Sequence, residues 1–216
     1  MVEKQETHNF EQPHIPVPME TLDVRSSVDR VLSDSTDVSL WQQGAKMYRQ
    51  FLSMIGDADL RGRYAADDEL QLIFLGEKPA IWGSPERFTP VQNELARFGL
   101  IIDENFLFNP VAVDGIARQY PNEFAELPTE NAAALIRSMN AAGIRKRFVE
   151  RGLLLGYPLS ACREFASARN ANEIDRQNPK VGLRGLRGME WVDYSGSLES
   201  QEKEQRIRRA YEVSGL

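Results

Sequence analysis

The chain of 216 residues contains one cysteine, Cys162, so it cannot form an internal disulfide. It contains no run of about 18 apolar residues, the length that a membrane-spanning helix needs. The polar N-terminal sequence also lacks the apolar core of a secretory signal. Together these absences predict a soluble protein of a reducing compartment without membrane association, and we expect it in the cytoplasm.

Histidine is almost as scarce as cysteine. The two histidines, His8 and His14, both lie in the polar N-terminal segment. A closed zinc site needs about four His, Cys or carboxylate ligands, and Ser–His or Cys–His catalysis needs a histidine positioned by the fold. The acidic clusters 57–59 and 67–69 leave a carboxylate site for Mg²⁺ or Ca²⁺ open, although their spacing is not that of an EF-hand. We expect no metal site.

The glycine-rich patterns that bind nucleotide phosphates are missing as well. Neither GxxxxGK[ST] nor GxGxxG after a strand occurs, so no nucleotide cofactor is expected. Cys162 falls on the apolar side of its predicted helix, which is typical of a small buried residue rather than a nucleophile. Acid–base chemistry by Asp, Glu, Lys or Tyr stays open, because nothing in the sequence selects a pair.

What the chain does contain is an ordinary globular composition. Hydrophobic residues make up 42% and charged residues 27% of the sequence. The spacing of the apolar residues predicts a mainly α protein: a compact multi-helix domain over 37–216, with one small β-hairpin near residues 100–108. Residues 1–36 are predicted to form a polar, mobile tail, in which the spacing of the valines allows a short helix at 22–32.

Capping residues and prolines locate the predicted helices. A helix over 38–55 can be capped by Ser35, Thr36 or Asp37. Asp67 marks the start of another helix, and Thr89 is a cap followed by a proline at the first helical position. The remaining predictions are helices over 111–120, from about 128, over 144–151, after Pro158 and over 198–213, with a loop over 170–188.

The order helix–helix–hairpin over 67–108 resembles a winged helix-turn-helix. The resemblance implies that the helix over 89–98 reads DNA while the hairpin touches the backbone. That helix, however, carries a single basic residue, Arg97, and the hairpin tip is Asp103–Glu104, which would repel phosphate. We therefore expect such a module to contact protein rather than DNA.

Charge is distributed unevenly along the chain. The net charge is −6, but eleven Lys and Arg residues and only four Asp and Glu residues lie between Arg137 and Arg187. This segment therefore carries +7 and the remainder −13. Such asymmetry bears on the choice of partner rather than on the fold.

Three groups of residues within this basic region are candidate anion-binding sites. The first is the 145–151 cluster, and the second is the corner at 156–163, where a helix starting after Pro158 would present free backbone amides. The third is the loop 182–188, in which glycines alternate with arginines able to grip phosphate or carboxylate. The predicted anion-binding residues are Arg145, Arg147, Arg151, Tyr157, Arg163, Arg184 and Arg187.

Three functions remain open at this point. We favour a non-enzymatic interaction protein that binds an anionic partner, nucleic acid or an acidic protein, through the basic 137–188 region. The alternative is a small-molecule enzyme or ligand-binding protein with a phosphate or carboxylate site at the 156–163 corner. A third reading is a structural subunit that docks through residues 22–32 and 198–213. Neither the oligomeric state nor the identity of a partner follows from the sequence.

Overall fold

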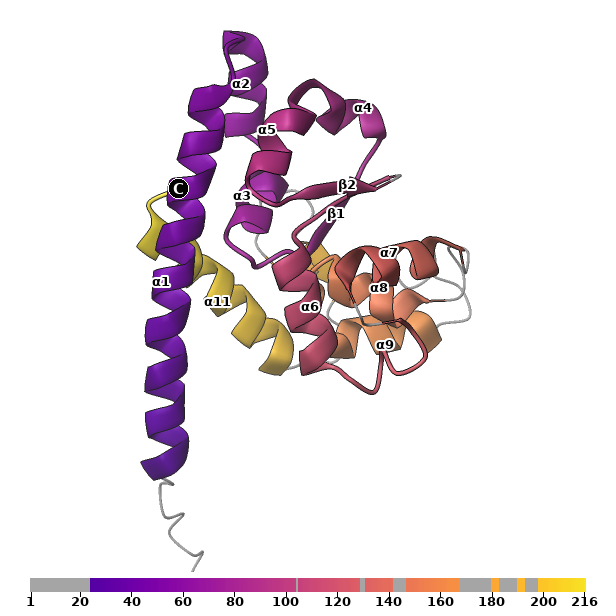
Figure 1. Ribbon diagram of the computed structural model, residues 1–216. Coiled ribbons are helices and arrows are strands. Elements are labelled where there is room, and N and C mark those ends of the chain that lie inside the picture. The colour runs from indigo at the N-terminus through magenta and orange to yellow at the C-terminus, as the bar shows by residue number, and fades with distance from the viewer. Residues whose placement is uncertain are drawn as a thin grey trace, which may run out of the picture.

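The computed structural model describes the backbone of residues 24–103, 105–128, 131–141, 147–167, 180–182, 190–192 and 198–216, and the side chains of 36–103, 105–128, 131–138, 147–167 and 198–216. Helices dominate this part of the chain, and a small three-stranded antiparallel sheet lies among them (Figure 1). The mainly α fold that the sequence predicts is confirmed. Residues 1–23 of the expected tail lie outside the described residues.

The first helix is longer than the sequence pattern predicts. α1 spans Val24–Met54 without a break, so the expected helices at 22–32 and 38–55 form one element. Asp37, one of the expected caps, lies inside α1, and its carboxylate accepts hydrogen bonds from Arg206 of the last helix, α11 (Leu198–Ser214). The Asp37 side chain therefore forms an ion pair with a distant helix instead of capping a helix.

Two short helices follow α1. Asp57 caps α2 (Ala58–Ala65), a helix that the sequence pattern did not predict. Asp67 caps α3 (Asp68–Phe74) as expected, because its side chain accepts from the backbone amide of Leu70 at 3.1 Å. This hydrogen bond satisfies one of the amides that a helix start leaves without a partner.

α1 and α3 approach each other closely at Gly44. A Cβ atom on this glycine would lie 2.3 Å from the carbonyl oxygen of Phe74. Next to this contact, the rings of Tyr48 and Phe51 pack on the ring of Phe74, with centroids 5.5 Å away in each case. The absence of a side chain at Gly44 thus lets the long helix lie directly against α3.

The sheet consists of β1 (Ala80–Trp82), β2 (Ile101–Asp103) and β3 (Phe106–Phe108), in the spatial order β1-β3-β2. Both pairs are antiparallel, and Leu107 lies opposite Ile81 and Ile102. The β2–β3 hairpin confirms the hairpin expected near 100–108. β1 is an additional strand, because a strand of three residues gives too short an apolar pattern to be recognised in the sequence.

The segment between β1 and β2 is helical but starts earlier than predicted. Helical turns begin at Pro85 rather than at Thr89, whose hydroxyl donates to the carbonyl of Pro85 at 2.8 Å instead of capping a helix. Pro85 occupies the first helical position, where its missing amide costs nothing. The segment contains α4 (Pro85–Phe88), a 3₁₀ turn η1 (Thr89–Val91) and α5 (Gln92–Arg97).

Four helices follow the sheet in the chain. Asn109 caps the first of them by accepting from the amides of Val111 and Ala112, and the helix at 111–120 is confirmed. Residues 142–146, part of the helix expected at 144–151, lie outside the described residues. The four helices are α6 (Pro110–Gln119), α7 (Ala132–Ala141), α8 (Phe148–Leu154) and α9 (Leu159–Ser167).

The sheet separates two hydrophobic cores. Ile81 and Leu107 point into a core formed with α1, α3 and α5. Ala80, Phe106 and Phe108 point to the opposite face, into a core formed with α6, α7, α8 and α9. Because side chains alternate between the faces of a strand, three short strands are enough to join the two helical layers (Figure 1).

The last helix, α11, crosses α1 and confirms the helix expected over 198–213 (Figure 1). Its buried residues Ile207 and Ala210 pack on α3 and on the segment that follows α3. A second hairpin precedes it, formed by β4 (Lys180–Gly182) and β5 (Glu190–Val192). The loop expected over 170–188 therefore contains a strand at its described residues, 180–182.

Candidate functional site

The predicted anion-binding residues that the structure describes lie on or beside α8 and α9. These two helices form an antiparallel pair in which Phe148 and Phe165 meet edge to face, with centroids 5.3 Å apart. The turn between the helices places Gly156 at a φ of 86°, a left-handed conformation that favours glycine. Arg145, Arg184 and Arg187 lie outside the described residues, so their placement stays a prediction.

Arg147 and Arg163 reach the same short loop, residues 121–127. Arg163 of α9 forms an ion pair with Glu123. Arg147, which precedes α8, donates to Glu150 at 2.9 Å and lies 3.5 Å from Glu126. The two loop glutamates are three residues apart, so their Cα atoms are separated by at most about 11 Å. The fold thus brings two of the predicted cations to one part of the surface.

The core holds this loop in place. Phe124 and Leu127 are buried in the second core, with exposures of 1% and 8%. The amides of Glu123 and Phe124 donate to the carbonyl of Tyr120, and the amide of Leu127 donates to the carbonyl of Phe124. We call residues 121–127 the acidic loop, because it carries Glu123, which is 19% exposed, and Glu126, which is 83% exposed.

Arg151 and Tyr157 have different surroundings from the other two. Burial lowers the pKa of the half-buried Arg151, against the opposing effect of Glu150. Tyr157 packs on apolar residues that include Leu72 and Ile207, at the contact between the α8–α9 pair and α11. The structure therefore gives Tyr157 a packing role, and a shared site with Arg147 or Arg163 stays a prediction for both residues.

The backbone amides at the start of α9 already have an acceptor. Glu199, in the first turn of α11, accepts from Leu159 at 2.8 Å through Oε1 and from Ser160 at 2.9 Å through Oε2. A carboxylate at this point is favoured by free N–H groups and by the helix dipole. An external phosphate or carboxylate at the 156–163 corner would have to displace Glu199.

Sequence reasoning missed a pair of buried charges, Glu77 and Lys78, in the segment between α3 and β1. Glu77 is 3% exposed and accepts from the indole of Trp41 at 2.8 Å. Lys203 and Arg206 of α11 also donate to its carboxylate, at 3.1 and 2.9 Å. Burial alone would raise the pKa of Glu77, but these two cations lower it below its ordinary value. The Glu77 carboxylate thus links α1 and α11 to the segment between α3 and β1.

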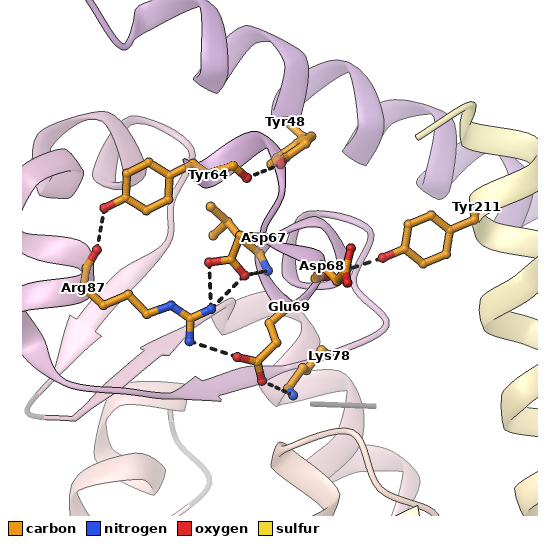
Figure 2. Close-up of polar contacts among 9 residues, drawn as sticks. Tyr48, Tyr64, Asp67, Asp68, Glu69, Lys78, Arg87 and Tyr211 are labelled. Carbon is orange, nitrogen blue, oxygen red and sulfur yellow. Dashed lines mark hydrogen bonds and ion pairs between the residues drawn. The ribbon is translucent and has the colours of Figure 1, made fainter. Parts of the chain in front are cut away.

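Lys78 points into a second polar network. Figure 2 shows its ammonium group on Glu69, at 2.6 Å, and the guanidinium of Arg87 between Glu69 and Asp67, at 2.9 and 2.7 Å. Two carboxylates and two cations balance in charge. Burial lowers the pKa of Lys78, while Glu69 opposes this effect.

Three tyrosines flank the network on its outer sides. The hydroxyls of Tyr48, Tyr64 and Tyr211 donate to the backbone carbonyls of Tyr64, Arg87 and Asp68, respectively (Figure 2). The Lys78 side chain is 1% exposed and that of Glu69 is 17% exposed. The network ties α3, α4 and the segment before β1 together, and Arg87 is its most exposed member, at 29%. Its signal in the sequence is a Glu–Lys pair placed between two apolar runs, 72–75 and 80–82, which are buried except for Trp82.

Two further features of the described residues are a thiol and a surface hollow. Cys162 is buried, and burial raises its pKa to about 12. A hollow of about 550 Å³ lies between α6 and the acidic loop. It is lined by Asp114, Ala117, Arg118, Pro121, Phe124, Ala125 and Leu127.

The described residues hold neither a metal cluster nor a membrane span. They contain no group of three or more His, Cys, Asp or Glu side chains placed to hold a metal ion. Within the same residues, no helix has the length and apolar character needed to cross a membrane.

Comparisons with protein-family models, curated proteins and solved structures gave no match to this chain.

Proposed function

We propose that this chain is a non-enzymatic interaction protein that binds an anionic partner through its basic 137–188 region. The observation that carries the proposal is that Arg147, which precedes α8, and Arg163 of α9 both reach the acidic loop. An extended partner that lies along this loop would therefore contact both guanidinium groups. Arg145, Arg184 and Arg187 are the further contacts that the sequence predicts.

The ion pairs leave the described arginines accessible to different degrees. The side chain of Arg163 is 61% exposed although it is paired with Glu123, and that of Arg147 is 21% exposed beside Glu126. Arg137, in the same basic region, is 61% exposed beside Asp103. Surface ion pairs of this kind contribute only about 0–1 kcal/mol each. A partner that presents several carboxylates or phosphates together can replace them at low cost, because arginine binds such groups in a bidentate manner.

An acidic protein segment fits the described surface better than nucleic acid does. Glu123, Glu126 and Glu150 lie among the arginines and repel any anion placed directly on them. Every link of a nucleic-acid backbone is charged, whereas an acidic segment of a protein can place its carboxylates at the guanidinium groups and neutral residues beside the glutamates. The acidic loop is an example of such a ligand, with two carboxylates three residues apart that meet Arg163 and Arg147.

The described residues offer less support for an enzyme. Lys78 and Glu69 are enclosed, and a thiol with a pKa of about 12 is protonated at neutral pH. At the 156–163 corner, Glu199 occupies the amides on which a small-molecule anion site would depend. The proposed interaction leaves the present contacts of Lys78, Glu69, Cys162 and Glu199 unchanged.

The test measures binding of two fluorescein-labelled probes, a ten-residue poly-Glu peptide and a ten-nucleotide oligo-U RNA, by fluorescence anisotropy over a salt series. We expect poly-Glu to bind more tightly than oligo-U and to bind more weakly as salt rises, since salt screens exposed charges. Arg163→Gln and Arg184→Gln should each weaken poly-Glu binding by about two- to fivefold, the effect of one surface ion pair.

Arg61→Gln on α2 is the matched control, because Arg61 is exposed and lies outside the basic region. It should change binding of poly-Glu by less than either test variant does. If neither probe binds at about 50 mM salt, where exposed charges are weakly screened, the proposed function is wrong. If oligo-U binds and poly-Glu does not, the partner is nucleic acid rather than an acidic protein.

A further inference from the structure

The acidic loop contacts two of the arginines that the proposed partner would bind. Glu123 is paired with Arg163, and Glu126 lies 3.5 Å from Arg147. These contacts are not local to one helix, since 40 and 21 residues separate the members of the two pairs. The same loop therefore meets both helix-borne arginines from a different part of the chain.

The loop cannot move away as a lid would. Phe124, between the two glutamates, is 1% exposed in the second core, and the loop closes on itself through hydrogen bonds to the carbonyls of Tyr120 and Phe124. A partner must therefore compete with Glu123 and Glu126 while these remain beside the arginines. The side chain of Glu126 is 83% exposed, so a solvent path to this contact is open.

We infer that the acidic loop is an internal competitor that lowers the affinity of this chain for its acidic partner. Glu123 and Glu126 neutralise Arg163 and Arg147 and repel incoming carboxylates at the same place. The inference rests on the proposed function, because it concerns the same arginines. Within that function it identifies the segment of this chain that sets how strongly an acidic segment binds.

The experiment compares the full chain with Glu123→Gln/Glu126→Gln, using the labelled ten-residue poly-Glu peptide at about 50 mM salt, where exposed charges are weakly screened. The glutamines keep the size of the side chains and remove their charge. Releasing two surface ion pairs should raise the affinity by about two- to fivefold for each pair. Glu126→Gln alone, at a largely exposed position, should raise it without any effect on folding.

The control is Glu202→Gln/Glu212→Gln, which makes the same change in net charge at two exposed positions of α11. A similar gain in poly-Glu affinity in the control variant would show a general effect of net charge and would overturn the inference. If the full chain and Glu123→Gln/Glu126→Gln bind poly-Glu with the same affinity, the inference is also wrong, while the proposed function stands. Absence of binding in every variant rejects the proposed function itself.

Discussion

A Cβ atom on Gly152 would lie 2.4 Å from the Sγ of Cys162, closer than such atoms approach in folded proteins. This contact sets the distance between α8, which carries Arg151, and α9, which carries Arg163. Glycine at 152 is needed for space rather than for an unusual backbone conformation, because Gly152 lies inside α8. A small residue and a thiol therefore determine how the two helices meet.

Gly152→Ala should destabilise the protein by about 1–3 kcal/mol, the usual cost of adding a methyl group to a filled core. Urea unfolding followed by circular dichroism measures the change. Gly115→Ala is the matched control, since Gly115 lies in α6 and a Cβ atom there would have no neighbour within 4 Å. Alanine there should leave stability equal or raise it by up to about 1 kcal/mol.

Replacing the sulfur should relieve the clash. In Gly152→Ala/Cys162→Ala the Sγ atom is gone, and the nearest remaining neighbour of the new methyl group is the Cβ at position 162, 3.3 Å away. The double variant should therefore be more stable than the sum of the two single effects predicts. Strict additivity of the two changes would show that the two residues do not contact each other as described.

Glu77→Gln should cost about 1.5–3 kcal/mol, the usual contribution of hydrogen bonds to a charged group, because Lys203 and Arg206 lose their bonds to the buried carboxylate. The loss should appear in the free energy of unfolding, again from urea titration. Glu202→Gln, at an exposed position of α11, controls for the change in net charge. An equal, small effect in both variants would show that the Glu77 carboxylate does not hold α11 on α1.

Stability should also fall on acidification. Burial would raise the pKa of Glu77, but Lys203 and Arg206 outweigh it and lower the pKa from 4.5. Burial is likewise outweighed at Glu69, where the neighbouring cations lower the pKa. The folded state then binds fewer protons than the unfolded chain. Its extra stability is fully present above the unfolded pKa of about 4.3 and is lost as the pH falls through the folded values.

We therefore expect the free energy of unfolding to begin to decline below about pH 5, where unfolded glutamates start to bind protons. The decline should be shallower in Glu77→Gln than in the wild-type chain. A series of urea titrations between neutral pH and about pH 3 tests this. If both proteins lose stability along parallel curves, Glu77 does not contribute the depressed pKa.

Local chemistry in the sequence predicted the elements that depend on few residues. Asp67 caps α3, and the chain turns between β2 and β3 where the polar triplet Asp103–Asn105 separates two apolar runs. In each case the structure follows from interactions between residues close in sequence, which a pattern can report.

The contacts between distant segments could not be predicted in this way. Asp37 pairs with Arg206, which is 169 residues away, instead of starting a helix. Glu199 accepts from Leu159 across 40 residues, although the sequence suggested an open anion site at that helix start. Carboxylates are plentiful in this chain, and only the fold determines which of them meets a given cation or amide.

Cys162 should react slowly with thiol reagents in the folded protein. Burial raises its pKa to about 12, so the reactive thiolate is rare at neutral pH, and the sulfur is shielded from solvent. Labelling with Ellman's reagent should be much slower in buffer than in concentrated urea, where the side chain is exposed. Fast labelling of the folded protein would contradict the packing of α8 on α9.

Glu199→Ala tests how α11 supports α9. The change removes the acceptor of the Leu159 and Ser160 amides, and loss of a helix-capping side chain costs about 0.5–2 kcal/mol. Hydrogen exchange of these two amides should quicken in the variant, whereas Glu202→Ala, at an exposed position further along α11, should leave it unchanged. Addition of phosphate separates two outcomes. If phosphate slows the exchange again in Glu199→Ala, the α9 start binds an external anion once Glu199 is gone. Unchanged exchange in both variants without phosphate would mean that Glu199 is not the cap.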